Sequence, residues 1–182
     1  LQAYTNTTSN DAKAAPGQYS YLSAVRAVRD ILAPLGWKPC SIENKVEAAV
    51  NNDETIQILV SSGDSATGDK TRDPKTKNTK GGIIGKIVKE SYEQLFLFPQ
   101  HEEIVTSSLD EISTWFLLYY LDKEKEELRL ELSFSNNYEV ISNLKKCWVT
   151  QWKPRIIFNP IKFGETLSPE ILDHFHAEED FD

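Results

Sequence analysis

Near the start of the chain, apolar residues recur at the spacing of an amphipathic helix. That helix is expected from Tyr19 to Leu35, and its apolar face would carry Leu22, Val25, Val28, Ile31, Leu32 and Leu35. The Pro34-Leu35-Gly36 sequence predicts its end. A second helix is predicted after Ser41, a residue suited to capping, and it would stop at Asn51-Asn52. Its apolar face would carry Ile42, Val46, Ala49 and Val50.

The pattern then changes to β-branched residues over Thr55–Ser62, which predicts a strand. A polar segment, Gly63–Gly82, follows with almost no apolar residues. Helical spacing returns between Ile83 and Phe98, and Pro99 is expected to end that helix.

Two apolar runs, Trp115–Leu121 and Leu128–Phe134, flank a charged tip and predict an antiparallel hairpin. Apolar and polar residues alternate in the second run, so we expect one face buried and the other exposed to water. A short helix is predicted over Tyr138–Lys146, followed by a strand over Cys147–Phe158. Pro154 indicates that this strand lies at an edge or contains a bulge.

These elements predict an α+β fold, with N-terminal helices packed on a mainly antiparallel sheet that has a central β-hairpin. We expect a flexible N-terminal segment at 1–18, a single domain at 19–164 and an acidic tail at 165–182. Apolar residues make up 40% of the chain and charged residues 26%, which is typical of a globular protein. The longest apolar run is far shorter than a membrane helix, so a soluble, cytoplasmic protein without membrane contact is expected. Cys40 and Cys147 are too few for a disulfide framework.

Charge is unevenly distributed along the sequence. The net charge is −8, yet residues 64–89 contain seven Lys or Arg against three Asp. The tail at 165–182 holds seven acids and no Lys or Arg. This asymmetry predicts a basic site on an otherwise acidic protein.

The basic segment begins like a phosphate-binding P-loop, because Gly63 and Gly68 have the required spacing. Asp69, however, separates Gly68 from Lys70, and its carboxylate would repel the phosphate. We therefore expect a looser anion site at the start of the helix near Ile83. Its predicted residues are Lys70, Arg72, Lys75, Lys77, Lys80, Gly81 and Gly82. The alternative is a solvated, mobile surface loop.

The leading functional hypothesis is a non-catalytic binding module for a phosphate-bearing partner, either a nucleic acid or a nucleotide. One alternative is a Mg²⁺-dependent nuclease or nucleotide-processing enzyme that uses Asp64, Asp69 and Glu131. Only that alternative calls for a cofactor. A further candidate metal pair is His174 and His176, although a solvated tail is the favoured interpretation. The last alternative is a protein-interaction module, in which the acidic tail binds a second copy or another basic partner. No motif identifies a family.

Overall fold

One mixed sheet organises the part of the chain that the computed structural model describes, residues 7–97, 112–141 and 146–163. Its strands are β1 (Lys38–Ile42), β2 (Val46–Val50), β3 (Ile56–Ser62), β4 (Lys80–Gly81), β5 (Ser113–Asp122), β6 (Glu127–Ile141), β7 (Lys146–Ile157) and β8 (Ile161–Lys162). The strand order is β1-β2-β3-β5-β6-β7-β4, and β8 pairs with β6. Within these described strands, β3 and β5 form the one parallel pair. The α+β class and the mainly antiparallel sheet are confirmed.

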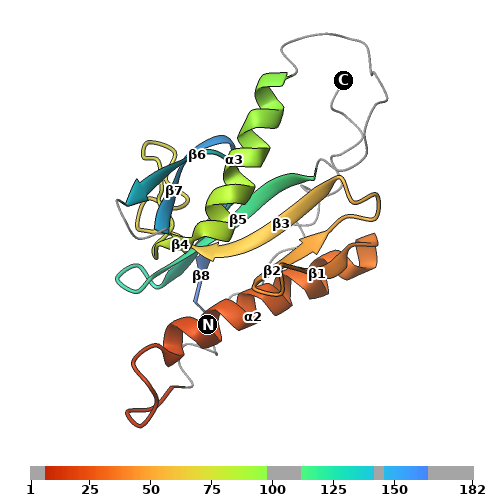
Figure 1. Ribbon diagram of the computed structural model, residues 1–182. Coiled ribbons are helices and arrows are strands. Elements are labelled where there is room, and N and C mark those ends of the chain that lie inside the picture. The colour runs from red at the N-terminus through yellow and green to blue at the C-terminus, as the bar shows by residue number, and fades with distance from the viewer. Residues whose placement is uncertain (1–6, 98–111, 142–145, 164–182) are drawn as a thin grey trace.

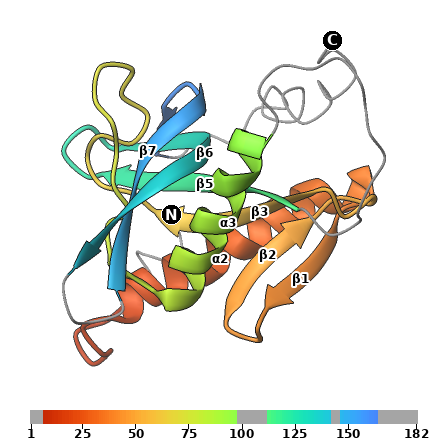
Figure 2. The same ribbon diagram turned by 45° about the horizontal axis from the view of Figure 1, so that its top comes forward.

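Helices cover both faces of the sheet (Figures 1 and 2). Helix α2 (Ala15–Leu32) continues into a short 3-10 turn, η1 (Ala33–Leu35), and α3 (Gly82–Leu97) lies on the opposite side. Successive residues of a strand point to opposite faces of the sheet and therefore pack against different helices. Leu117 packs with the buried residues of α2, whereas Leu118 packs with those of α3. Within the described residues, neither helix is long and apolar enough to cross a bilayer.

Residues 63–79, which connect β3 to β4, lie against the α3 side of the sheet. The indole nitrogen of Trp152 donates a hydrogen bond to the Pro74 carbonyl at 2.8 Å. Thr76 exchanges two hydrogen bonds with Val149, each 3.3 Å long. Trp152 and Val149 both belong to the hydrophobic cluster under α3. The segment is therefore a covering layer of the domain rather than a loop surrounded by solvent.

The first predicted helix is confirmed, although it begins at Ala15 rather than Tyr19. Gly36 follows its final 3-10 turn with φ of 86°, a conformation that glycine adopts without strain. The second predicted helix is wrong, because β1 and β2 form a hairpin there. Glu43 and Asn44 both have positive φ at its turn, as a tight hairpin connection requires. The apolar residues fit a helical face, but the hairpin also places them against the core.

The prediction of a helix from Tyr138 is also wrong, because β6 continues as a strand to Ile141 and pairs with β7. Residues 142–145 lie outside the described part of the chain. The bulge that Pro154 predicted is confirmed. The register shifts between the pairs Ser133–Arg155 and Ser135–Trp152, which leaves one extra residue on β7.

One face of the second hairpin arm was expected to be exposed to water, and this expectation is wrong. Arg129, Glu131 and Ser133 are 9%, 0% and 0% exposed. The polar face is covered because residues 63–79 fold over it. Alternation in a strand shows which residues share a face, but it does not show whether another segment covers that face.

Candidate anion-binding cleft

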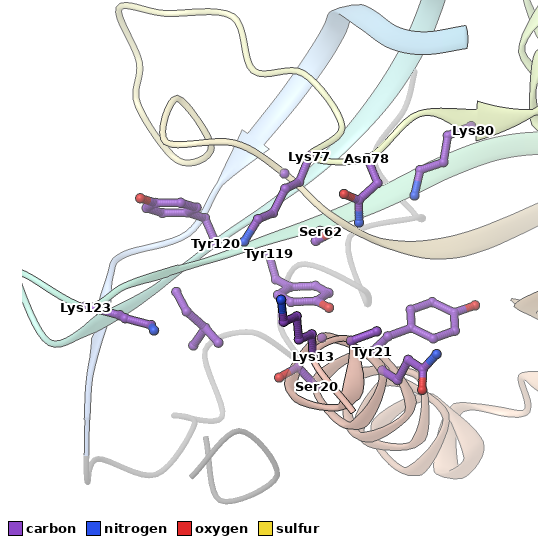
Figure 3. A pocket seen from close by; sticks show the side chains of 15 residues that line it. Lys13, Ser20, Tyr21, Ser62, Lys77, Asn78, Lys80, Tyr119, Tyr120 and Lys123 are labelled. Carbon is purple, nitrogen blue, oxygen red and sulfur yellow. The ribbon is translucent and has the colours of Figure 1, made fainter. Parts of the chain in front are cut away.

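A cleft of about 690 Å³ lies where β3 and β5 end beside the start of α2 (Figure 3). Ser62 closes β3, and Tyr119, Tyr120 and Leu121 lie near the end of β5. The register pairs Ser62 with Tyr119, so β3 ends three residues before the end of β5. The space outside the carboxyl ends of parallel strands is a frequent ligand site in proteins with helices on both sheet faces.

Four lysines line the cleft, and they come from three separate parts of the chain. Lys13 precedes α2, and Lys123 lies in the turn after β5. Lys77 lies near the end of the 63–79 segment, and Lys80 is the first residue of β4. Figure 3 shows these side chains pointing from several sides toward the same space. Among the described residues, no Asp or Glu lines the cleft. The wall is therefore cationic although the chain as a whole is acidic.

Neutral hydrogen-bonding groups complete the wall. They are contributed by Gln18, Ser20, Tyr21, Ser62, Asn78, Tyr119 and Tyr120. Burial, assisted by the neighbouring Tyr21, raises the pKa of Tyr119 to about 12. The pKa of Tyr21 is also raised, first by burial and then by the nearby Glu47 carboxylate. Both phenols therefore stay protonated at neutral pH. The Tyr21 hydroxyl is hydrogen-bonded to the Glu47 backbone, so Tyr119 is the phenol that can donate to an anion.

Backbone hydrogen bonds hold the 63–79 segment so that Lys77 returns to the end of β3. The Lys77 amide donates to the Ser62 carbonyl at 2.8 Å, and the Gly63 amide donates to the Tyr119 carbonyl at 2.9 Å. Gly63 is required sterically, because a Cβ atom there would lie 2.0 Å from Oγ1 of Thr67. These hydrogen bonds hold both ends of the 63–79 segment at the end of β3, and they thereby place Lys77 in the cleft wall.

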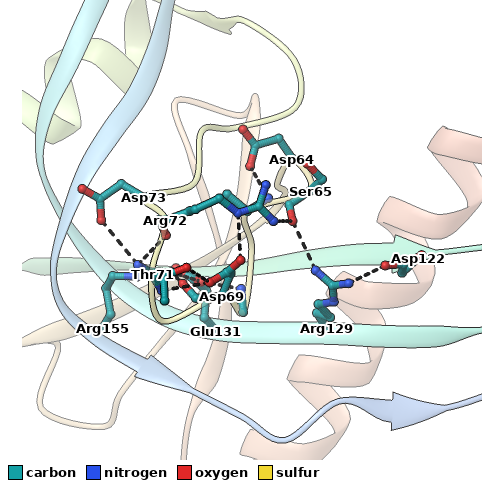
Figure 4. A network of polar contacts seen from close by, with 12 residues as sticks. Asp64, Ser65, Asp69, Thr71, Arg72, Asp73, Asp122, Arg129, Glu131 and Arg155 are labelled. Atoms are coloured by element: carbon teal, nitrogen blue, oxygen red, sulfur yellow. Dashed lines mark hydrogen bonds and ion pairs between the residues drawn. The ribbon is translucent and has the colours of Figure 1, made fainter. Parts of the chain in front are cut away.

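Glu131 and Arg155 anchor the middle of the same segment (Figure 4). The Glu131 carboxylate accepts hydrogen bonds from the Gly68 amide at 2.7 Å, the Ser133 hydroxyl at 2.9 Å and Arg155 at 2.7 Å. Arg155 also donates to the backbone carbonyls of Asp69, at 3.1 Å, and of residue 72, at 2.9 Å. One buried ion pair therefore holds the middle of the segment, residues 68–72, on the sheet.

A second arginine, Arg129, connects this segment to the cleft. It forms ion pairs with Asp122 and with Glu127, and it donates to the Ser65 carbonyl at 3.2 Å. Its guanidinium carbon lies 5.7 Å from the centre of the Tyr120 ring, in the cleft wall. The ion pair also directs the Asp122 carboxylate toward Arg129. Arg129 and Lys162 together lower the pKa of Glu127 through their hydrogen bonds.

The structure brings together only part of the predicted anion site. Lys77 and Lys80 line the cleft, whereas Lys70, Arg72, Lys75, Gly81 and Gly82 are not among its lining residues. Arg72 instead pairs with Asp69 at 2.8 Å and donates to the Ser65 carbonyl at 2.8 Å. Gly81 pairs with Lys146 in the sheet, and the cleft lining reaches Lys80, two residues before α3 begins.

Two lining residues, Lys13 and Lys123, were not predicted from the sequence. Lys13 falls in the stretch that was expected to be a flexible lead-in, and Lys123 falls in a hairpin tip of alternating charge. Neither position carries a local signal, since each joins the cleft only through the packing of distant segments.

The three candidate catalytic carboxylates each accept hydrogen bonds from the protein. Asp64 accepts from the Ala66 amide at 3.0 Å, and Glu131 is held by Arg155. Hydrogen bonds from Thr71, then from Arg72, hold the pKa of Asp69 well below its usual range. Within the described ranges, no group of three or more His, Cys, Asp or Glu is arranged to hold a metal ion. His174 and His176 lie outside those ranges.

Together, the fold and this site define an α+β protein with a basic cleft at the ends of two parallel strands. Models of known protein families, curated proteins and solved structures were compared with the chain, and none matches it.

Proposed function

We propose that this chain is a non-catalytic binding module that takes a phosphate-bearing ligand into the cleft between α2 and the ends of β3 and β5. One observation carries the proposal. Four lysines and no carboxylate are found among the described residues that line the cleft, although the net charge of the chain is −8. An acidic protein that gathers lysines around a hollow creates a local positive potential, which attracts anions.

The residue types support phosphate in particular. Lysine carries a compact point charge on a flexible stem, and in this form it is a common phosphate ligand in proteins. The protonated Tyr119 adds a neutral donor beside these charges. The carboxyl ends of the parallel strand pair provide the rigid floor on which the site is built.

Titration calorimetry with inorganic tripolyphosphate tests this function. Lys77→Glu reverses a charge that points into the cleft, so affinity should fall by about tenfold or more. The matched control is Lys70→Glu, since Lys70 is an exposed lysine of the same segment that does not line the cleft. The affinity of Lys70→Glu for tripolyphosphate should remain within about twofold of that of the parent protein.

Added salt should weaken binding to the parent protein, because ionic screening reduces the attraction between lysines and phosphate. Equal losses in Lys77→Glu and Lys70→Glu would contradict a localised site. The complete absence of tripolyphosphate binding would refute the proposed function.

Two other hypotheses stay predictions. The acidic tail at 165–182 lies outside the described residues, so a protein-interaction role for it is untested. The nuclease alternative gains no support from the geometry, because Asp64, Asp69 and Glu131 are each engaged by donors of the protein itself.

A further inference from the structure

The two sides of the cleft differ in chemistry. Figure 3 shows Lys123 at one side, with Lys77 and Lys13 between it and the rest of the site. Asn78, Tyr21 and Lys80 lie toward the other side. A ligand that fills the cleft would therefore meet Lys123, Lys77 and Lys13, with Tyr120, at one end. At the other end it would meet the Asn78 amide and the Tyr21 ring beside the Lys80 ammonium.

The amide and phenol end has the groups that recognise a nucleoside. Gln18 and Tyr21 are three residues apart on α2, so they lie on the same face of the helix. Asn78 approaches from the 63–79 segment. Carboxamides present a donor and an acceptor next to each other, which matches the edge of a nucleobase. Tyrosine rings provide surfaces for base contact. The Ser20 hydroxyl donates to the Pro16 carbonyl at 2.7 Å, so it can still accept a hydrogen bond from a sugar hydroxyl.

On the basis of the proposed function, we infer that the cleft binds a nucleoside polyphosphate. The phosphates would contact Lys13, Lys77 and Lys123, and the base would contact Gln18, Tyr21 and Asn78. The cleft volume of about 690 Å³ falls within the usual range for small-molecule sites, about 300–1,000 Å³. A continuous strand of nucleic acid would extend beyond the cleft and meet the remaining surface of a chain with net charge −8.

The experiment compares three probes by titration calorimetry on the full chain. These are the four common ribonucleoside triphosphates, inorganic tripolyphosphate and a short single-stranded oligonucleotide of mixed sequence. Tripolyphosphate has the phosphate chain without the nucleoside. At least one triphosphate should bind about tenfold more tightly than tripolyphosphate, because it gains the base and sugar contacts.

Variants separate the two ends of the site. Gln18→Ala and Asn78→Ala alter exposed side chains, so neither should disturb the fold. Each should weaken binding of the preferred triphosphate by about threefold to tenfold, and weaken binding of tripolyphosphate by a clearly smaller factor. Asn52→Ala is the matched control, because Asn52 is exposed and does not line the cleft. It should change neither affinity.

The outcomes also separate this inference from the proposed function. If tripolyphosphate binds as tightly as every triphosphate, the nucleoside inference is refuted while the phosphate site stands. If the oligonucleotide binds more tightly than every triphosphate and loses affinity with Lys77→Glu, the ligand is a polymer, which also refutes the inference. If no probe binds, the proposed function itself fails.

Discussion

Replacing Glu131 by Gln should destabilise the protein, because this carboxylate clamps the 63–79 segment to the sheet. Glu131 is 0% exposed and lies 2.7 Å from Arg155, whose side chain is 12% exposed. The substitution preserves the shape of the side chain but removes its charge. It therefore leaves the largely buried Arg155 guanidinium with the exposed Asp73 carboxylate, 3.4 Å away, as its remaining counter-charge.

The magnitude follows from this burial. Breaking a buried ion pair by removing one partner costs about 3–5 kcal/mol. Gln keeps one oxygen that can still accept from the Gly68 amide, so we expect a loss at the lower end, about 3 kcal/mol. For a chain of this size, each kcal/mol shifts the midpoint of thermal unfolding by about 2–4 °C. The midpoint should therefore fall by about 6–12 °C.

Urea unfolding followed by tryptophan fluorescence measures this loss. Trp152, one of four tryptophans, is fully buried and its indole donates to the Pro74 carbonyl, so its share of the emission changes when the segment leaves the sheet. Glu124→Gln is the matched control, because Glu124 is an exposed carboxylate in the turn after β5. It should change the free energy of unfolding by less than about 0.5 kcal/mol.

A loss below about 1 kcal/mol for Glu131→Gln would refute the clamp. The same variant also examines the nuclease alternative. If Glu131 served a metal rather than the fold, Gln at this position would abolish Mg²⁺-dependent turnover without lowering stability. The buried ion pair predicts that Glu131→Gln is destabilised, and the proposed binding module predicts no Mg²⁺-dependent turnover in the parent protein.

Two further predictions concern the cleft walls. Gly63→Ala should lower the free energy of unfolding by about 1–3 kcal/mol, because its Cβ would overlap Thr67 Oγ1. Urea unfolding measures this loss. A Gly63→Ala variant with unchanged stability would contradict the packing described. Gly82→Ala, where a Cβ meets nothing within 4 Å, is the control and should be neutral. The raised pKa of Tyr119, about 12, means that the folded protein holds this proton more tightly than the unfolded chain. Stability should therefore fall between about pH 10 and pH 12, more steeply in the parent than in Tyr119→Phe; identical slopes in urea unfolding across this range would contradict the shift.

Local patterns in the sequence were sufficient for several elements. The helix ending at Leu35, the strand over Thr55–Ser62, the helix after Gly82 and the hairpin around residues 115–134 all match the structure. Each depends on periodicity and on nearby Pro or Gly residues, which act within a few positions along the chain. The basic segment at 64–89 was likewise visible in the sequence, and two of its lysines line the cleft.

Only the tertiary structure decided the remaining features. Residues 42–50 have the spacing of a helical face, yet they form a hairpin because β2 pairs with β3 and because Arg29 binds the Cys40 and Ala48 carbonyls. Glu131 has the alternation of an exposed position, yet a segment more than sixty residues earlier buries it. The local sequence favours a helix or a hairpin, and an exposed or a buried strand face, almost equally, and long-range pairing selects between them.

The cleft depends on the same long-range pairing. The sequence by itself determined that this acidic chain carries a concentration of lysines after a strand. The tertiary structure decided which of them face a common hollow, and it added Lys13 and Lys123 from distant segments. The physical reason is that a charge acts over distance in space, and neighbours in space are set by how strands and helices pack rather than by their order along the chain.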